Sequence, residues 1–397
     1  MEGKIKICII GLGYVGLPLF KVVSQYFDCR GLDNSASAIK NIKCQDFCSD
    51  NMALTSDWNV VLDCNVFIVC VPTPIKENNE PDLSSLGDVC ESLGKVIKSG
   101  DVVIFESTVY PGATEEYCVP ILEKYSDLCC NIDFFVGYSP ERINVGDTEH
   151  TINRVPKIVS GSNSYATKAI ANIYRTILGE NIVIAPSIKV AEAAKMYENV
   201  QRDVLIALAN EYADYCRVEG IDIEAVTECA STKWNFTSVN PGLVGGHCIS
   251  VDPYYMMAKA KMKDVAVPLI KTAREVNESK PSKIADRIVD CINHSNKITT
   301  NAKVLILGFS YKPNISDIRN TKVYDVIKYL TSRSISCDCI DPWVDTTLAK
   351  EVYGVNVFNH IDQIADEYDL VVNLVSHKVF DSEAFLNLHP IKLNELV

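Results

Sequence analysis

The sequence predicts an α/β protein in which two parallel-sheet domains are joined by a central all-α region with a long helix. Short apolar runs alternate with helix-length segments over the first half of the chain, and this texture returns near Lys303. Between the two, the segment from Ile188 to Glu219 contains no glycine or proline and carries apolar residues at helical spacing. The opening KIKICIIGLG is echoed by NAKVLILGFS at 301–310, which indicates that the two α/β domains are structural repeats.

The strands expected in the first domain are short and almost continuously apolar, which is typical of a parallel sheet covered by helices on both faces. Pro186 and Ser187 then mark a change of texture, so we place the first domain at residues 1–187. In chain order the expected strands are Ile5–Ile10, Cys29–Leu32, Val66–Val71, Val102–Phe105, Phe134–Gly137, Lys157–Val159 and Ile182–Ile184.

The segment from Ile188 to Glu219 predicts one helix of ~48 Å. Further helices are expected around Ile223–Ala230 and Val265–Asn293, so we place a central helical domain at residues 188–298. A helix of this length more often joins domains or forms a dimer seam than packs as one layer. We therefore expect a homodimer that pairs through this helix.

The last domain, residues 299–397, repeats the strand and helix texture of the first. Strands are expected at Lys303–Gly308, Ser336–Ile340 and Val371–Leu374, with a helix at Val323–Ser332. A strand that ends in glycine and is followed by polar residues is a natural place for a phosphate-bearing ligand.

The composition excludes several classes of protein. The 397 residues carry 38 Lys and Arg against 51 Asp and Glu, a net charge of −13, and no Lys/Arg-rich block appears, so we expect neither nucleic acid nor membrane as a partner. The longest uncharged apolar run, Ile7 to Phe20, is too short to span a bilayer and lacks a signal-peptide cleavage site. The 16 cysteines show no zinc-type spacing, which favours a reduced cytoplasmic protein without a metal site.

The glycines of GLGYVG follow the first strand and precede a helix-compatible stretch. Gly11 permits a tight turn, Gly13 lets the backbone approach a pyrophosphate, and Gly16 lets the helix pack on the strand. Asp33 stands at the end of the second strand, where a carboxylate accepts hydrogen bonds from a ribose 2′-OH and repels a 2′-phosphate. The pattern predicts a Rossmann-like domain that binds NAD rather than NADP.

Cys248 lies in the loop GGHC, among glycine, histidine and aspartate rather than on an apolar face. Such a thiol is either a nucleophile activated by a nearby cation or helix dipole, or one more inert cysteine. Lys195 and Asn199 are four residues apart, on one face of the long helix. Lys195 has core-type neighbours, where a charge needs a partner, and the alternative is a solvated flank.

Further polar residues follow predicted strands, at the sheet edge where ligands bind in parallel α/β folds. Thr108, in ESTVYPG, follows the fourth strand, and Glu141 follows the fifth after Ser139 and Pro140. In the last domain, Lys312 and Arg319 lie in GFSYKPNISDIRNT after its first strand. These two cations suit a diphosphate, or are plain surface cations.

Together these segments resemble the nucleotide-sugar 6-dehydrogenase family over nearly the whole chain. The matching motifs are GLGYVGLPL, VPTP, ESTVYPGAT, SPERIN, AEAAKMYENVQRD, KWNF, NPGLVGGHCISVDPYY and GFSYKPNISDIRNT. PERINVGD and VGGHCISVDP are similar to the branch that acts on UDP-N-acetylhexosamines, rather than to the UDP-glucose branch. The resemblance implies an NAD-dependent enzyme that oxidises the C6 alcohol of a UDP-sugar to a carboxylate with two NAD.

The resemblance also implies roles for individual residues. Cys248 would be the nucleophile, Lys195 and Asn199 would stabilise an oxyanion, and a thioester on the cysteine would be cleaved by water. Asp252, Thr108 and Glu141 would position or activate that water. The implied cofactor contacts are Gly11, Leu12, Gly13, Tyr14, Val15, Gly16, Asp33, Thr73, Thr108 and Arg319. The implied substrate contacts are Glu141, Arg142, Ile143, Lys195, Asn199, Arg202, Asn235, Gly245, Tyr311 and Lys312.

The implied substrate is UDP-GlcNAc or UDP-GalNAc, supplying uronate precursors for polysaccharide or glycan synthesis, with UDP-glucose as the alternative. The β-hydroxyacid dehydrogenases are a rival class, but they need no cysteine and lack a second nucleotide-type domain. A non-enzymatic NAD-sensing module would have no use for Lys195, Asn199 and Cys248 together. The chain ends at Val397, and we expect a last strand and helix of the family's UDP domain to be missing.

Overall fold

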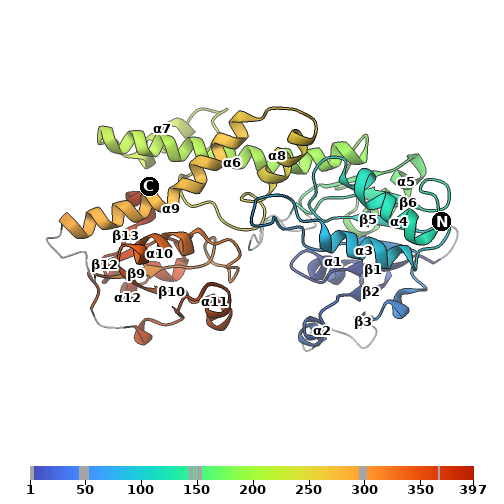
Figure 1. Cartoon of the computed structure of the whole chain (residues 1–397), viewed down its shortest axis with the longest axis horizontal. Helices are drawn as coiled ribbons and strands as arrows, with labels where there is room; N and C mark the ends of the chain where they lie inside the picture. The colour runs from blue at the N-terminus through green and yellow to red at the C-terminus, as the bar shows by residue number, and fades with distance from the viewer. Residues whose placement is uncertain are drawn as a thin grey trace. The chain divides into compact units, whose positions relative to one another are not determined.

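The computed structural model describes residues 4–43, 53–142, 146, 149, 154–294, 302–364 and 367–397. The chain forms two compact units (Figure 1). The first unit comprises Met1–Glu198 and Tyr254–Lys263, and the second comprises Asn199–Pro253 and Asp264–Val397. The chain passes between them three times: within the long helix after Glu198, after Pro253 and after Lys263.

The first unit is built on one sheet with the strand order β3-β2-β1-β4-β5-β6-β7-β8. All residues of β4 and β5 are buried, as expected of strands covered on both faces. The order reverses between β1 and β4, and ligands of open α/β sheets bind at the carboxyl ends of the strands beside such a point. The strands are β1 (Lys6–Ile10), β2 (Asp28–Leu32), β3 (Ala53–Thr55), β4 (Val66–Val69), β5 (Val102–Phe105), β6 (Phe135–Tyr138), β7 (Lys157–Gly161) and β8 (Ile182–Ile184).

One pair in this sheet departs from the predicted parallel pattern. β7 runs antiparallel to β6, with Gly137 opposite Gly161 and Tyr138 opposite Ser160. β8 then pairs parallel to β7. Strand direction is decided by the connection rather than by the strand's own residues, and an apolar run reads the same in both directions. The short strand β3 was also not predicted.

The helices of the first unit pack their apolar faces against the sheet. Leu19, Phe20 and Val23 of α1 join the β1 and β4 side chains in one buried cluster, together with Ile170 and Tyr174 of α5. The helices are α1 (Gly16–Val23), α2 (Ala36–Lys43), α3 (Ser84–Gly94), α4 (Val119–Ser126) and α5 (Ser164–Leu178).

The long central helix is confirmed at the predicted bounds: α6 spans Ile188–Glu219. It is followed by α7 (Ile223–Ser231), α8 (Asp252–Met262) and α9 (Pro268–His294). α8 was not predicted, because it begins with Asp-Pro directly after the GGHC loop and its apolar residues have no clear periodicity. α9 continues through Pro281.

The second unit contains a parallel five-stranded sheet with the order β11-β10-β9-β12-β13. Its first three strands in chain order mirror β1, β2 and β3, which confirms the predicted repeat. The strands are β9 (Lys303–Leu307), β10 (Ser336–Ile340), β11 (Val357–Phe358), β12 (Leu370–Asn373) and β13 (Ile391–Lys392), and the helices are α10 (Lys322–Ser332), α11 (Thr346–Tyr353), α12 (Glu383–Leu386) and α13 (Leu393–Leu396).

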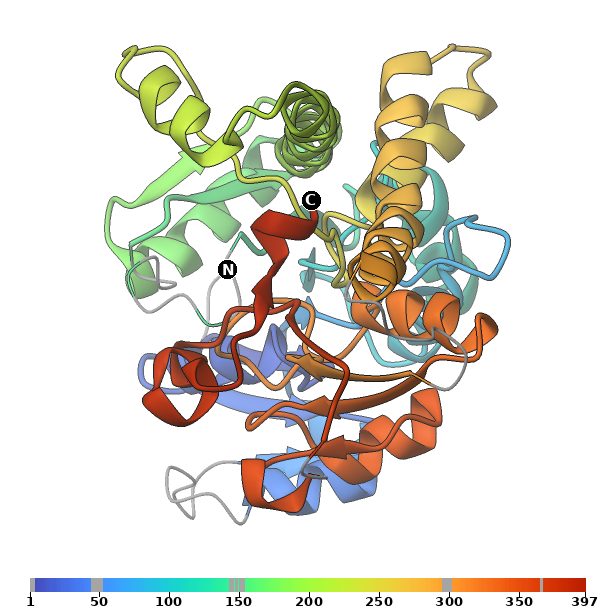
Figure 2. The ribbon, with the colours of Figure 1, turned by 90° about the vertical axis from the view of Figure 1, so that its left-hand side faces the viewer.

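The second unit closes with a short strand and a short helix, and the expectation that a further strand and helix of the family's UDP domain are missing stays a prediction. β13 pairs with β12, and α13 follows it. The Leu396 carbonyl accepts a hydrogen bond from Arg287 of α9. Figure 2 shows this C-terminal segment, in red, rising from the sheet toward α9.

Among the described residues, no helix combines the length and the apolar character needed to cross a membrane. The long helices α6 and α9 instead carry charged residues that pair with each other inside the second unit. Asp203 of α6 accepts a 2.9 Å hydrogen bond from Arg274 of α9, and both side chains are buried.

A second ion cluster between α6 and α9 surrounds Asp214. Its carboxylate lies 3.0 Å from Lys280, 2.9 Å from Lys283 and 2.5 Å from Arg287. Burial alone would raise the pKa of Asp214, but hydrogen bonds from the three cations hold that pKa well below its usual value. Because Lys280 and Arg287 are buried, one carboxylate neutralises two cations that water cannot reach.

We predict that Asp214→Asn lowers the free energy of unfolding at pH 7 by about 3 kcal/mol, because it leaves buried cations without a counter-charge. The pKa of Asp214 is depressed in the folded state, so its contribution is present at neutral pH and is lost only as the pH falls toward the folded pKa. Urea unfolding at pH 7 measures the change. Asp290→Asn, on the exposed face of α9, is the control, and equal stability of both variants would contradict the assignment.

Candidate active site

The glycine loop after β1 is held by the carboxylate at the end of β2. Asp33 Oδ2 accepts a 2.8 Å hydrogen bond from the Leu12 amide, and Oδ1 accepts one of 2.9 Å from the Ser35 amide. Each carboxylate oxygen keeps a second lone pair, so the same group can also accept ribose hydroxyls. Tyr14 and Val15 lead from this loop into α1, and Tyr14 is exposed.

The three glycines of the loop face different surroundings. Gly11 has a φ of +86°, and a Cβ on it would meet the Cys70 carbonyl oxygen at 3.0 Å. A Cβ on Gly16 would lie 1.8 Å from the Gly11 carbonyl oxygen, so only glycine fits there. A Cβ on Gly13 would meet nothing within 4 Å. This open side fits a pyrophosphate that approaches the backbone at the start of a helix.

Two further loops at the same sheet edge are tied together. Thr73, after β4, donates from its hydroxyl to the Thr108 carbonyl after β5 at 2.6 Å. The Tyr255 hydroxyl of α8 lies 2.9 Å from the Thr73 carbonyl oxygen and 3.1 Å from that of Pro74. Thr73 and Thr108 are therefore brought together at the edge predicted for the cofactor.

Thr108 belongs to a loop that Glu192 of α6 anchors. The buried Glu192 carboxylate accepts hydrogen bonds from the Gly112 amide at 2.5 Å and the Thr114 amide at 2.9 Å. Burial raises the pKa of Glu192 to about 7, although both hydrogen bonds oppose that rise.

Glu141, after β6, is held at both carboxylate oxygens. Oε1 accepts from the Arg142 amide at 2.6 Å, and Oε2 accepts from the Lys157 ammonium at 3.1 Å. Lys157 also donates to Glu106 Oε2 at 2.8 Å. Arg142 itself forms an ion pair with Glu198 of α6, with a shortest distance of 2.6 Å.

Lys195 is buried, so the alternative that it lies on a solvent-exposed side of the long helix is excluded. Only 7% of the residue is exposed, and within the described part of the chain its ammonium forms no ion pair. An unneutralised cation in such a place favours a neighbouring anion. Asn199, one helical turn further along α6, is also buried and donates to Asp252 at 2.5 Å.

Cys248 belongs to the second unit and lies four residues before α8 begins at Asp252. Its carbonyl accepts hydrogen bonds from the amides of Val251 at 3.0 Å and Asp252 at 2.8 Å, which start the helix. The residue is half-buried, whereas Cys90 and Cys118 are fully buried. A thiol that stays partly accessible can react, whereas a thiol buried among apolar side chains is inert. This partial exposure distinguishes Cys248 from the inert thiols.

The loop before Cys248 is clamped by the loop after β9. Asn320 donates from its amide to the Gly246 carbonyl at 2.9 Å. Gly246 has a φ of +86°, and a Cβ there would lie 2.9 Å from the Tyr311 ring. A Cβ on Gly245 would lie 2.7 Å from the Asn320 carbonyl oxygen. Both glycines are therefore required by close packing.

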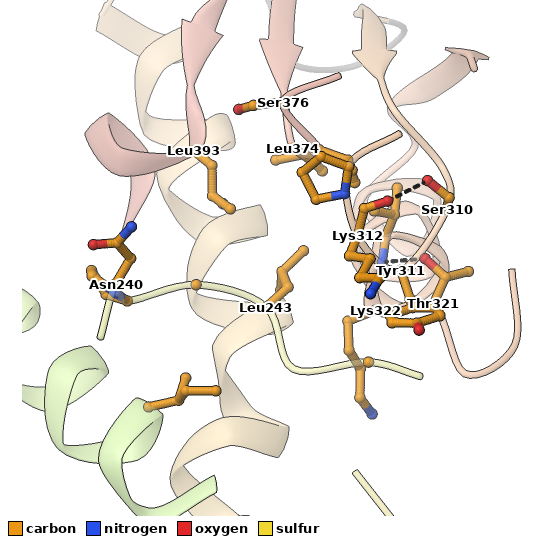
Figure 3. Close-up of a pocket in the computed structure, with 17 residues that line it drawn as sticks. Asn240, Leu243, Ser310, Tyr311, Lys312, Thr321, Lys322, Leu374, Ser376 and Leu393 are labelled. Atoms are coloured by element: carbon orange, nitrogen blue, oxygen red, sulfur yellow. Dashed lines mark hydrogen bonds between the residues drawn. The ribbon is translucent and has the colours of Figure 1, made fainter. Parts of the chain in front are cut away.

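A pocket of about 240 Å³ lies in the second unit, at the carboxyl ends of β9 and β12 (Figure 3). This is the switch point of the five-stranded sheet, where the strand order reverses. Its polar side carries Lys312, Lys322 and Thr321, and its apolar side includes Leu243 and Leu374. Gly245, three residues before Cys248, also lines it.

The pocket meets the N-terminus of α10. Thr321 caps this helix by accepting a 3.3 Å hydrogen bond from the Val323 amide. Thr321, Lys322 and Val323 all line the pocket. A helix N-terminus flanked by lysines is suited to a phosphate group.

The remaining predicted site residues lie elsewhere. Arg202 and Asn235 are exposed and are not among the residues that line the pocket. Arg319 pairs with Asp317 at 2.5 Å in the second unit, whereas the glycine loop belongs to the first. Ile143 lies outside the described residues. The roles of these residues stay predictions.

Sequence reasoning missed Lys157, Glu106 and Asn320. A charged residue at the first position of the apolar run KIVSG was the available signal for Lys157, because a lysine beside a buried strand needs an anionic partner. Within the described residues, no group of three or more His, Cys, Asp or Glu side chains is placed to hold a metal ion.

The fold and these sites define a dinucleotide-binding enzyme with a second nucleotide-type domain, and the comparisons with known proteins give its family. Residues 5–178 match the NAD binding domain of the UDP-glucose/GDP-mannose dehydrogenase family, residues 189–279 its central domain and residues 305–395 its UDP binding domain. The chain therefore belongs to this family, and it is an NAD-dependent oxidoreductase that acts on a UDP-sugar.

Individual relatives are similar over almost their whole length. The chain is 42% identical to UDP-N-acetyl-D-glucosamine 6-dehydrogenase of Pseudomonas aeruginosa, over 97% of this chain and 93% of that one. It is 40% identical to the protein of the same name from Salmonella typhi, over 95% and 91%. Among solved structures, UDP-D-ManNAc dehydrogenase of Pyrococcus horikoshii superposes with a TM-score of 0.88 at 27% identity, over 99% of this chain and 96% of that one.

The glycine loop generates a matched pair of predictions. Gly16→Ala should lower the free energy of unfolding by about 2–3 kcal/mol, because the added methyl has no room. Gly13→Ala should leave that free energy within about 0.5 kcal/mol of wild type. It should nevertheless weaken NAD binding at least about tenfold, because the methyl projects where the pyrophosphate approaches. Urea unfolding and calorimetric NAD titration separate the two effects, and unchanged NAD affinity in Gly13→Ala would contradict this placement of the cofactor.

Proposed function

We propose that this chain oxidises the C6 alcohol of UDP-N-acetylglucosamine to a carboxylate through a covalent intermediate on Cys248. The observation that carries the proposal is the link between the pocket and the thiol inside the second unit. Gly245 lines the pocket and lies three residues before Cys248, and Gly245 and Gly246 pack on Asn320 and Tyr311. In this proposal, a sugar attached to a diphosphate in the pocket lies near Cys248, in the loop that precedes α8.

The pocket suits the UDP moiety. Lys312 and the N-terminus of α10 supply positive charge for a diphosphate. The Lys322 ammonium also lines the pocket, but it is already paired with Glu278 at 2.5 Å and Asp325 at 3.2 Å. Leu243, Leu374 and their apolar neighbours offer a surface for a base. The match of residues 305–395 to a UDP binding domain supports this assignment.

The chemistry at Cys248 follows from what a thiolate can do. When the C6 alcohol has been oxidised to the aldehyde, the sulfur adds to the carbonyl carbon and forms a thiohemiacetal. Oxidation of that adduct gives a thioester, and water then releases the carboxylate and the free thiol. Capture of the aldehyde explains how one site performs two oxidations without releasing an aldehyde.

Five other side chains take part in this reaction sequence in the proposal. Lys195 and Asn199 stabilise negative charge on the C6 oxygen, because both are buried on one face of α6 and Lys195 carries no paired anion among the described residues. Asp252 orients Asn199 through their hydrogen bond. Glu141 and Thr108 position the water that cleaves the thioester.

The cofactor binds at the glycine loop of the first unit in this proposal. Gly13 leaves the open side for the pyrophosphate, and Asp33 accepts the ribose hydroxyls. NAD, when bound, accepts the electrons of each oxidation. The proposal also keeps the division into residues 1–187, 188–298 and 299–397, although residue 298 lies outside the described residues.

We further infer a reducing, cytoplasmic setting, because all the cysteines that the structure describes are free thiols. The substrate assignment rests on the names of the relatives from Pseudomonas aeruginosa and Salmonella typhi. UDP-GalNAc and UDP-glucose are the alternatives, and they differ from UDP-GlcNAc in one hydroxyl orientation and in the acetamido group, respectively.

We predict that the enzyme makes two NADH per UDP-GlcNAc and releases no aldehyde, with lower kcat/KM for UDP-GalNAc and UDP-glucose. Cys248→Ser should lower turnover by several orders of magnitude, because a hydroxyl is far less acidic than a thiol of pKa about 8.5. Cys229→Ser, an exposed thiol in the same unit, should keep wild-type turnover. An NADH assay checks all of these, and full activity of Cys248→Ser would exclude the covalent route.

The proposed homodimer rests on α6 within the second unit. Leu208, Tyr212, Tyr215 and Val218 are 59%, 49%, 54% and 81% exposed and recur at helical spacing. Such a stripe is typical of an interface between two copies.

We predict a mass near 2 × 44.0 = 88.0 kDa by light scattering at micromolar protein. Leu208→Asp combined with Tyr215→Asp should halve that mass, because two charges would enter the apolar seam. A monomeric wild-type protein would exclude the dimer.

A further inference from the structure

The antiparallel strand β7 brings a lysine to the catalytic edge of the first sheet. In a parallel strand the first residue lies at the opposite edge from the carboxyl ends of its neighbours. β7 runs against β6, with Tyr138 opposite Ser160. The first residue of β7, Lys157, therefore lies beside the residues that follow β6, and its ammonium contacts Glu141 there.

The Lys157 ammonium is enclosed by two carboxylates. It lies 3.1 Å from Glu141 Oε2 and 2.8 Å from Glu106 Oε2, and it is 5.6 Å from the centre of the Tyr174 ring. Glu106 follows β5 and also accepts a hydrogen bond from the Tyr174 hydroxyl. The side chains of Lys157 and Glu106 are 4% and 0% exposed, whereas that of Glu141 is 12% exposed. Glu141 is therefore the member of the cluster that other molecules can reach.

Several charged and titratable groups lie around Glu141 within the part of the chain that the structure describes. They include the Lys157 ammonium, the Glu106 carboxylate, the neutral acids Tyr174 and Cys70, and Arg142, whose guanidinium pairs with Glu198. Burial raises the pKa of Glu106, and Lys157 opposes that rise. Burial alone would lower the pKa of Lys157, but the two carboxylates keep it above its usual value. One buried cation thus serves two anions, of which only Glu141 is partly exposed.

We propose that Lys157 is a positioning residue that keeps the Glu141 carboxylate ionised and fixed in orientation for cleavage of the thioester by water. The inference rests on the proposed function, because it takes from there the role of Glu141 toward water. Lys157 fixes Oε2, the Arg142 amide fixes Oε1, and the remaining lone pairs of Glu141 are directed by these two contacts. Glu106 acts as the buried counter-charge that keeps the lysine in place.

The test follows the covalent adduct rather than overall activity. Lys157→Met should slow decay of the enzyme-bound acyl group at least about tenfold at pH 7, because Glu141 beside Glu106 takes up a proton when the lysine's charge is removed. The acid limb of the pH profile for that decay should move to higher pH by about one unit or more. Rapid quench followed by intact mass spectrometry measures the decay, with UDP-GlcNAc and NAD as substrates. Lys168→Met, an exposed lysine on α5, is the control and should behave as wild type.

A second variant predicts the opposite shift. Glu106→Gln removes the competing anion, so Glu141 keeps the lysine to itself and the acid limb should move to lower pH. If these side chains only support the fold, both variants should change the decay rate equally at all pH values, and the acid limb of the pH profile should not move. That outcome overturns the proposal. Circular dichroism shows whether Lys157→Met folds. If it does not, the position of the acid limb in the pH profile of Glu106→Gln tests the proposal by itself. A wild-type enzyme that forms no covalent adduct would instead overturn the proposed function.

Discussion

A carboxylate at the end of the second strand fixes the first ligand loop in both sheets of this protein. Asp33 accepts the Leu12 amide, and Asp341 accepts the amides of Phe309 and Ser310 at 2.8 and 2.9 Å. Asp341 is fully buried and also bonds His377 at 2.9 Å, so its oxygens are occupied by the protein itself. Asp33 is only half-buried and keeps lone pairs for a ligand. The same device therefore holds the glycine loop in one unit, where we propose that the dinucleotide binds, and stabilises a pocket wall in the other.

The residues of the proposed chemistry are distributed over the two units. The first unit holds the glycine loop, Glu141 and Lys195, and the second holds Cys248 and the pocket for the diphosphate. α6 carries the chain from one unit to the other, with Lys195 and Asn199 one turn apart on it. This distribution gives each unit one ligand, and it explains why the family-wide motifs are spread along the whole sequence.

Local patterns predicted most of the fold but not the network around Glu141. α6, the glycine loop with Asp33, and the repeat at β9 follow from periodicity and glycine chemistry, which act over a few residues. The direction of β7 depends on the long connection before it, so the sequence could not show that the Lys157 ammonium would contact Glu141. Likewise Asn320 reaches Gly246 across 74 positions of sequence, and no local pattern records such a contact. The sequence does not predict whether Lys195 is buried, because helical spacing alone does not show which faces of α6 are covered by other elements.

The central claim is that the oxidised sugar is bound to Cys248 before water releases it. The most direct measurement is rapid acid quench of the wild-type enzyme during turnover of UDP-GlcNAc and NAD, followed by digestion and peptide mass spectrometry. The account predicts a hydroxylamine-labile acyl adduct on the peptide that contains Cys248. Formation of two NADH per sugar with no adduct on that peptide, or with the adduct on another cysteine, would contradict it.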